Sequence, residues 1–137
     1  MATYKITHIA TGKVVNLYSL NTTAPVNNGD RLLLYNWENN NDQKWVATGY
    51  GPYVLLHSAR DTSKVINRHS VNNNAHVWYY DGTGNPDGSP TETDRDSVIN
   101  TESNSNGSRI KLVYRNLYLT KNAGDNYLSW AEKIEGD

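Results

Sequence analysis

Short strand-like segments recur along this chain, and the stretches between them contain no convincing helix. The segments are rich in β-branched, aromatic and leucine side chains, and clusters of Asn, Gly and Pro separate them, as expected for turns. Because these turn residues interrupt every spacer before a stable helix can form, we predict an all-β protein. The expected strands cover residues 4–9, 14–18, 31–37, 44–48, 53–57, 64–68, 75–80, 96–101, 109–114, 116–121 and 126–132.

These strands form a weak threefold repeat. Val15-Asn16-Leu17 has counterparts in Ile66-Asn67-Arg68 and in Leu119-Thr120-Lys121. Each unit of about 45 residues opens with a hairpin and continues with an aromatic-rich strand. Four strands per unit, repeated three times, match a six-stranded barrel closed by three hairpins, which leaves no sheet edge exposed. We expect one domain over residues 1–137, with repeats at approximately 1–50, 51–101 and 102–137.

Composition restricts the size of the core and the class of partner. A chain of 137 residues fits a single core. Thirteen basic and fourteen acidic residues give a net charge of -1, so the protein has no broad positive electrostatic potential that would attract a polyanion or an anionic membrane. We therefore expect no nucleic-acid partner and no membrane insertion. Cysteine is absent, which excludes disulfides and thiolate zinc sites, and no cofactor is expected.

The first residues suggest no classical secretion signal. The segment 1–5 lacks an apolar signal-peptide core, and no run approaches the ~20 apolar residues of a membrane span. A cytoplasmic location or release without a classical signal is therefore expected, and the compartment stays open.

The first repeat carries a family resemblance. Asn41-Asp42-Gln43-Lys44-Trp45 resembles the Gln-x-Trp box of ricin-B-type (R-type) lectins, whose Gln and Trp pin a barrel layer. Upstream, Thr11-Gly12-Lys13-Val14-Val15-Asn16 is similar to the family's Ser/Thr-Gly-Lys-x-Leu-Asp segment, and Leu34-Tyr35 to its Leu-Trp or Leu-Tyr. The match covers residues 4–50. It implies a β-trefoil fold and carbohydrate binding without catalysis.

The other two repeats depart from this pattern. Asp94-Arg95-Asp96 stands where the second box is expected, and the third repeat reaches Asp137 before its box, so the third repeat lacks its last strand. Three interpretations remain open: a shortened chain, a strand supplied by a partner, or a different register in the third repeat.

Sugar recognition requires an aromatic ring that stacks on a pyranose and amide or carboxylate groups that bind neighbouring hydroxyls. In the first repeat the resemblance implies Asn16 at the family's Asp position, Tyr35 as the stacking ring and Asn41 or Asp42 as a second contact. Trp37 replaces Tyr35 if the register shifts by two, and burial of both rings in the core is the alternative. Gln43 and Trp45 are expected to be mainly structural, with Gln43 also in reach of a ligand.

In the second repeat Asn67 is the counterpart of Asn16. Trp78, Tyr79 and Tyr80 follow, and then Asp81 and Asn85. Alternation places Trp78 and Tyr80 on one face and Tyr79 on the other, and we expect Tyr79 or Tyr80 to stack on the sugar. In the third repeat Thr120 is too short for bidentate contacts. No conventional site is expected beside Trp130 there unless Asp125 or Asn126 takes the place of Thr120.

Enzymatic motifs are lacking. No Gly-x-Ser-x-Gly elbow occurs, and the acidic pairs Asp94/Asp96 and Glu132/Glu135 are expected on the solvated surface. The four histidines are also expected at the surface, without clustering for a metal.

The sequence therefore predicts a non-catalytic lectin for galactose/GalNAc-type or N-acetylated sugars on glycans or glycoproteins, with a homodimer as one route to multivalency. The rival hypothesis is a protein-binding β-trefoil, such as a protease inhibitor or a haemagglutinin component of a toxin complex, using residues 86–106. A carbohydrate-binding module separated from an enzyme is a third option.

Residues 91–107 are expected to form a mobile loop around a short strand near residues 97–100.

Overall fold

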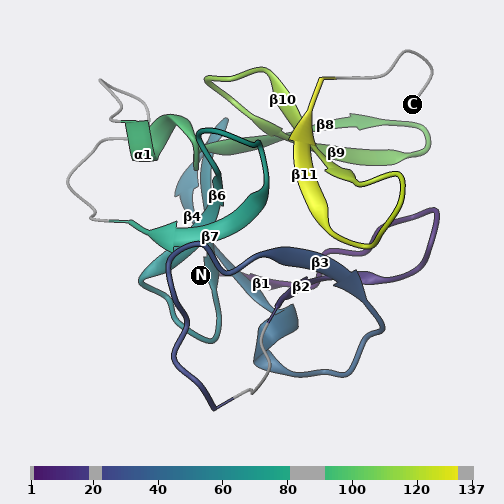
Figure 1. The fold of residues 1–137 in the computed structure, drawn as a ribbon. Coiled ribbons are helices and arrows are strands. Elements are labelled where there is room, and N and C mark those ends of the chain that lie inside the picture. The colour runs from purple at the N-terminus through teal and green to yellow at the C-terminus, as the bar shows by residue number, and fades with distance from the viewer. Residues whose placement is uncertain (1, 19–22, 81–91, 133–137) are drawn as a thin grey trace.

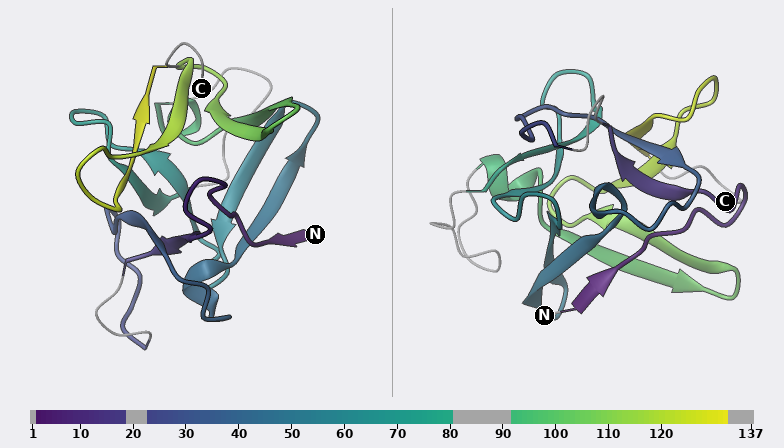
Figure 2. Two further views of the ribbon diagram at one scale, coloured as in Figure 1. Left: turned by 90° about the vertical axis from the view of Figure 1, so that its right-hand side faces the viewer. Right: turned by 90° about the horizontal axis from the view of Figure 1, so that it is seen from below.

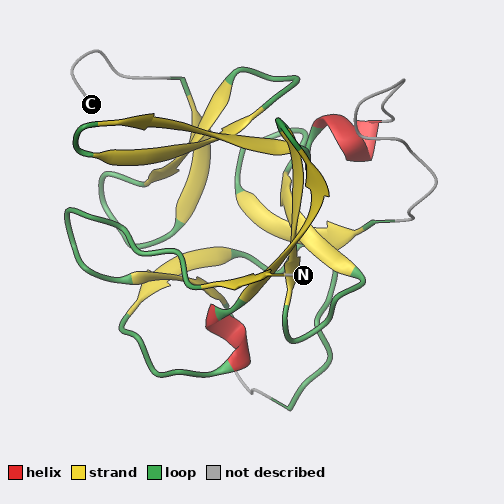
Figure 3. Cartoon of the chain, turned by 180° about the vertical axis from the view of Figure 1, so that it is seen from behind, coloured by secondary structure: helices red, strands yellow, loops and turns green. Residues whose placement is uncertain are grey.

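The computed structural model describes residues 2–18, 23–80 and 92–132, and eleven strands lie within them, as the sequence predicts (Figure 1). Two helical turns accompany the strands and lie well apart (Figure 3). The elements are β1 (Ala2–Tyr4), β2 (Val14–Leu17), β3 (Leu32–Tyr35), the 3-10 helix η1 (Asn41–Gln43), β4 (Trp45–Tyr50), β5 (Tyr53–Ser58), β6 (Lys64–Arg68), β7 (Ala75–Tyr79), α1 (Glu92–Arg95), β8 (Ile99–Asn104), β9 (Gly107–Leu112), β10 (Leu117–Lys121) and β11 (Leu128–Ala131).

Five strands build the barrel. They pair antiparallel in the order β1, β4, β5, β8 and β9 (Figure 2). Strand β4 pairs over its first residues with β1, where Tyr4 lies opposite Trp45, and over its whole length with β5. Strand β8 meets β5 at Val54 opposite Ile99 and forms a six-residue ladder with β9. Within the described residues the barrel therefore consists of the first and last strands of each repeat, except for the last strand of the third.

The hairpins β2–β3, β6–β7 and β10–β11 form the second layer. Single bridges join them in pairs: Arg31 to His76, Leu33 to Tyr127, and Asn74 to Ser129. Each hairpin thus touches both others around one axis. This arrangement is a β-trefoil, and it confirms the predicted fold. The expected boundary at residue 101 falls inside β8, which ends at Asn104.

One apolar core joins the barrel to the hairpins. Trp45 and Trp130 are its largest fully buried side chains, and they pack with Leu17, Leu32, Leu34, Ile66, Val77 and Leu112. Burying an aromatic side chain of this size stabilises a fold by several kcal/mol, roughly 3–5 when truncation to Ala is measured. Trp45 is therefore structural, as predicted. Trp130, predicted to lie on an aromatic recognition strand, is buried as well, so it cannot serve as a sugar platform.

The segment 91–107 is more regular and more buried than its composition predicts. Helix α1 and the six-residue strand β8 occupy most of it. Asp94 and Asp96, expected on the solvated surface, are buried, so that prediction is wrong. For Asp96 the reason is ion pairing, because its Oδ1 accepts from Arg68 Nε at 3.0 Å and from Arg115 Nε at 2.9 Å. The two guanidinium groups compensate the lost hydration of the buried Asp96 carboxylate. Composition alone does not reveal that these three side chains meet.

Candidate functional site

The three hairpins present corresponding outward faces, because their registers match. The inward pairs are Val15 with Leu34, Ile66 with Val77, and Leu119 with Trp130. Side chains alternate along a strand, so the neighbours of these residues point away from the core. The outward positions are Asn16 and Tyr35 in the first hairpin, Asn67 and Trp78 in the second, and Thr120 and Ala131 in the third.

In the first hairpin the structure brings Asn16 and Tyr35 together. Asn16 lies opposite Leu33, and Tyr35 lies two residues further along β3, so the two side chains are diagonal neighbours at roughly 7–8 Å. Tyr35 is 47% exposed. Asn16 is half-buried and its Nδ2 donates to the carbonyl of Leu17 at 2.9 Å. An aromatic face and an oriented amide therefore share one surface.

The Gln-x-Trp box holds this surface in place. Gln43 Nε2 donates to the Asn36 carbonyl at 2.6 Å, and Gln43 Oε1 accepts from the Glu38 amide at 2.7 Å. Trp45 Nε1 donates to the carbonyl of Val15 at 3.2 Å. The box thus fixes both the loop that follows Tyr35 and the strand that carries Asn16. Both the nitrogen and the oxygen of the fully buried Gln43 side-chain amide form hydrogen bonds within the protein, which supports its expected structural role.

Asn41 and Asp42, the alternatives for a second polar contact, have different environments. Asp42 is buried and accepts from Arg60 Nη1 at 3.0 Å, while Arg60 Nη2 donates to the carbonyl of Ala24. Asn41 is exposed in η1, which Asn40 caps by accepting from the Asp42 amide. Of the two, Asn41 faces solvent near the first hairpin.

Trp37 lies on the loop after β3 and is exposed, so neither Trp37 nor Tyr35 is core. Lys5 Nζ lies 4.8 Å from the centroid of the Trp37 ring. A cation over one face occupies that face of the indole. Tyr35, on the same hairpin face as Asn16, is the ring better placed for stacking.

In the second hairpin Asn67 is buried and bonded at both ends. Its Nδ2 donates to Ser97 Oγ at 2.8 Å, and its Oδ1 accepts from His76 Nε2 at 2.7 Å. His76 is itself buried, so the prediction that every histidine lies at the surface is wrong for this residue. Burial, and secondarily the charge of His69, lower the pKa of His76 to about 4. His76 is therefore neutral at pH 7 and carries its proton on Nε2.

Two rings of the second repeat are exposed. Trp78 is 40% exposed and its ring lies 5.6 Å from that of His76, while Tyr79 is exposed at the end of β7. Tyr80 is half-buried and packs on the small cluster of Leu55, Val65 and Val98. Asp81 and Asn85 lie outside the described residues.

Trp78 is an exposed ring that the sequence did not single out as a candidate. It pairs with Val65 as Tyr35 pairs with Val14. Tyr35 follows Asn16 by 19 residues and Trp78 follows Asn67 by 11, so the correspondence emerges only from the strand registers, which together with alternation determine the face.

The third hairpin offers little for a sugar. Thr120 Oγ1 donates to the carbonyl of Tyr118 at 2.9 Å, and Ala131 occupies the position of Tyr35 and Trp78. The threefold fold thus carries at most two aromatic faces of this kind within the described ranges.

Residues 2–18, 23–80 and 92–132 contain no group of three His, Asp or Glu side chains that could hold a metal ion. Among the described helices, none has the length and apolar character needed to span a membrane.

No family model matches the chain, and no curated protein matches it. Solved structures do match, and they share the fold. The designed three-fold symmetric protein ThreeFoil is 14% identical, with a TM-score of 0.75, over 98% of this chain and 91% of that one. The Rhizoctonia solani agglutinin is 17% identical, with a TM-score of 0.69, over 98% and 88%. The Macrolepiota procera ricin B-like lectin in complex with lactose is 18% identical, with a TM-score of 0.65, over 98% and 88%.

Two further similar structures belong to much longer proteins. The chain covers 16% of a mosquitocidal holotoxin at 14% identity and a TM-score of 0.76. It covers 30% of an endo-β-galactosidase from Clostridium perfringens at 14% identity and a TM-score of 0.73. This chain is thus a β-trefoil whose structural neighbours include an agglutinin and a ricin B-like lectin.

Proposed function

We propose that this chain is a non-catalytic lectin that binds sugars through the outward face of its first hairpin. The observation that carries the proposal is the exposed Tyr35 ring beside the Asn16 amide, both held by the buried Gln43 and Trp45. Tyr35 stacks on the C–H face of a pyranose, and Asn16 and Asn41 bind its hydroxyls. The similar fold of several lectins supports this assignment.

The sugar class that we propose is galactose/GalNAc-type or N-acetylated, presented on glycans or glycoproteins. A shallow face with one ring and two amides gives weak single-site binding, with Kd roughly 0.1–1 mM. Avidity then arises from a second contact at one of the exposed rings of the second hairpin, Trp78 or Tyr79, or from a homodimer. The role proposed for Tyr79 and Trp78 rests on their exposure.

The test is a glycan array with the purified chain, followed by titration of the best sugar into Tyr35→Ala. We expect about a tenfold loss of affinity, because a stacking aromatic contributes on the order of 1.4 kcal/mol or more. Tyr4→Ala is the matched control, since Tyr4 is equally exposed but lies on barrel strand β1. No binding to any glycan at high protein density, or equal losses in both variants, would contradict the proposal.

A further inference from the structure

The outward face of the first hairpin continues beyond Asn16 and Tyr35. Tyr18 follows β2 and Arg31 precedes β3, and the Tyr18 amide donates to the Arg31 carbonyl at 2.8 Å, which extends the register by one pair. Because side chains alternate along a strand, Tyr18 and Arg31 share this outward face. Tyr18 is 40% exposed and Arg31 is half-buried. Arg31 and Tyr35 are four residues apart, about 13 Å along the strand, so the face is longer than a single pyranose ring.

Arg31 lies where the three hairpins meet. Asn74 and Tyr127 hold the same position in the other two hairpins: each directly precedes the second strand, and its carbonyl accepts, at 2.9 Å, the amide that directly follows the first strand. Arg31 Cζ lies 4.1 Å from the centroid of the Tyr127 ring, and Arg31 Nη2 donates to Asn74 Oδ1 at 3.3 Å. The Tyr18 and Tyr127 ring centroids are 6.3 Å apart. The junction therefore holds a guanidinium group that lies over one tyrosine ring, with a second, exposed ring beside that one.

The charge of Arg31 is not balanced within residues 2–18, 23–80 and 92–132. No carboxylate in these ranges forms an ion pair with it. Its side chain makes a single hydrogen bond there, to Asn74, and its buried Nε has no acceptor. Asp30 and Asp125, the acidic residues nearest in sequence to the junction, each accept a backbone amide close to them in the chain. The guanidinium group therefore keeps donors for a further, negatively charged acceptor.

We propose that the site on the first hairpin takes an oligosaccharide with a negatively charged sugar, whose carboxylate or sulfate group binds Arg31 while a neighbouring sugar stacks on Tyr35. This inference rests on the proposed function, since it names the glycan class for the same face. The guanidinium fork binds two oxygens of one such group, which also orients the ligand along the face. The equivalent positions Asn74 and Tyr127 are uncharged, so the described hairpins offer this contact only in the first repeat.

Two features favour a saccharide over another anion. The exposed Tyr18 ring lies opposite Arg31 on the same face and provides a surface for the C–H groups of a pyranose. Asn74 adds a side-chain amide at the guanidinium group, as Asn16 does near Tyr35. A ring and an amide therefore occur at both ends of the face, and the positive charge is added at one end.

The test uses the 137-residue chain and three ligands with one core: lactose, sialylated lactose and sulfated lactose. In calorimetric titrations at low salt, at least one acidic form should bind about tenfold more tightly than lactose, because a hydrogen bond to a charged group is stronger than a neutral one. Added salt should reduce this difference. The two acidic arms identify whether a carboxylate or a sulfate is preferred.

Equal or weaker affinity for both acidic forms would overturn this inference and leave the proposed function intact. Absence of binding to all three ligands would overturn it as well, whereas the proposed function is decided by the glycan array.

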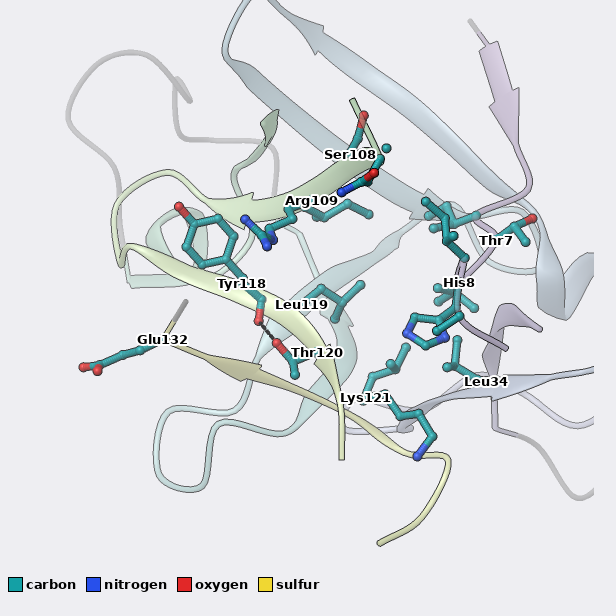
Figure 4. A pocket seen from close by; sticks show the side chains of 18 residues that line it. Thr7, His8, Leu34, Ser108, Arg109, Tyr118, Leu119, Thr120, Lys121 and Glu132 are labelled. Atoms are coloured by element: carbon teal, nitrogen blue, oxygen red, sulfur yellow. Dashed lines mark hydrogen bonds between the residues drawn. The ribbon is translucent and has the colours of Figure 1, made fainter. Parts of the chain in front are cut away.

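Arg31→Gln removes the charge but keeps an N–H for Asn74. We expect affinity for the acidic ligand to fall about tenfold, to that of lactose, and affinity for lactose to stay unchanged. Arg109→Gln is the matched control, because Arg109 lies on barrel strand β9 at a groove of about 430 Å³ and not on the hairpin face (Figure 4). Equal losses for lactose and its acidic form in Arg31→Gln would show a structural role, and equal losses in both variants would show a general charge effect. Either result would overturn the inference.

Tyr18→Ala keeps the test decisive if thermal melts show that Arg31→Gln does not fold. The Tyr18 ring is exposed at the end of β2, so its removal should leave the fold intact. Binding of the acidic ligand should weaken by about threefold to tenfold, with no change for lactose. Unchanged binding of the acidic ligand would overturn the inference.

Discussion

The first and second hairpins share a register but use their asparagines differently. Asn16 is half-buried on a face that it shares with the exposed Tyr35, whereas Asn67 is buried between His76 and Ser97. Trp78 occupies the position of Tyr35 but lies against the His76 ring. A residue type repeated at the same position of a pseudo-symmetric fold therefore does not imply a repeated site.

The cause of this difference lies at the start of the last strand of each repeat. In the first repeat Gln43 and Trp45 bind backbone groups and leave the Asn16 side chain at the surface. In the second repeat Ser97 and Asp96 occupy this region, and Ser97 Oγ draws the Asn67 amide inward. The Asn67 carbonyl meanwhile accepts from Trp130 Nε1 at 3.2 Å, so the third repeat also restrains the second.

The largest effect should come from Trp45→Ala. Removing a fully buried indole, and with it a hydrogen bond to Val15, should lower the free energy of unfolding by about 3–5 kcal/mol. Chemical denaturation measures this loss. If the variant stays as stable as the parent and loses only sugar affinity, the box is a binding element and not a structural one.

The second repeat should make stability depend on pH. The folded pKa of His76, about 4, lies below its usual value near 6.5, so the unfolded chain binds a proton that the folded chain does not. Stability contributed by neutral His76 is complete above pH ~6.5 and should be lost as the pH falls towards 4, by about 2–3 kcal/mol. Thermal melts across this range measure the loss.

His76→Gln is the control for this pH dependence. Its side chain retains an N–H for Asn67 but does not titrate. His69 and Arg31 adjoin His76 and remain in this variant, so the difference between the two pH profiles isolates His76. Identical slopes between pH 4 and 6.5 would show that His76 is not the responsible group.

The smallest expected effects come from replacing Asn16 and Asn67, and they distinguish the roles of these two residues directly. Asn16→Ala should weaken sugar binding by about tenfold with little change in thermal stability, because its side chain borders an exposed face. Asn67→Ala should instead lower stability by about 1–3 kcal/mol, since it leaves buried His76 and Ser97 without a partner, and should preserve affinity at the first hairpin. Reversed outcomes would place the sugar site in the second repeat.

Local pattern in the sequence was enough to predict the strands and the threefold repeat, and the resemblance of the Gln-x-Trp box to that of R-type lectins implied the structural role of Trp45. Alternating apolar residues and turn clusters report which face of a short strand is buried, and the Gln-x-Trp box marks where a repeat ends. Asn16 and Tyr35 were candidates through the same resemblance, and the strand register places both on the outward face.

The tertiary structure alone decided the environments of the polar residues. Asp96 is buried because Arg68 and Arg115, 28 and 19 residues away, converge on it. Asn67 is buried because Ser97, 30 residues away, accepts its amide hydrogen. Trp130 enters the core because its indole reaches a carbonyl 63 residues distant. A polar group becomes buried when distant partners compensate its lost hydration, and such partners meet only in the folded chain.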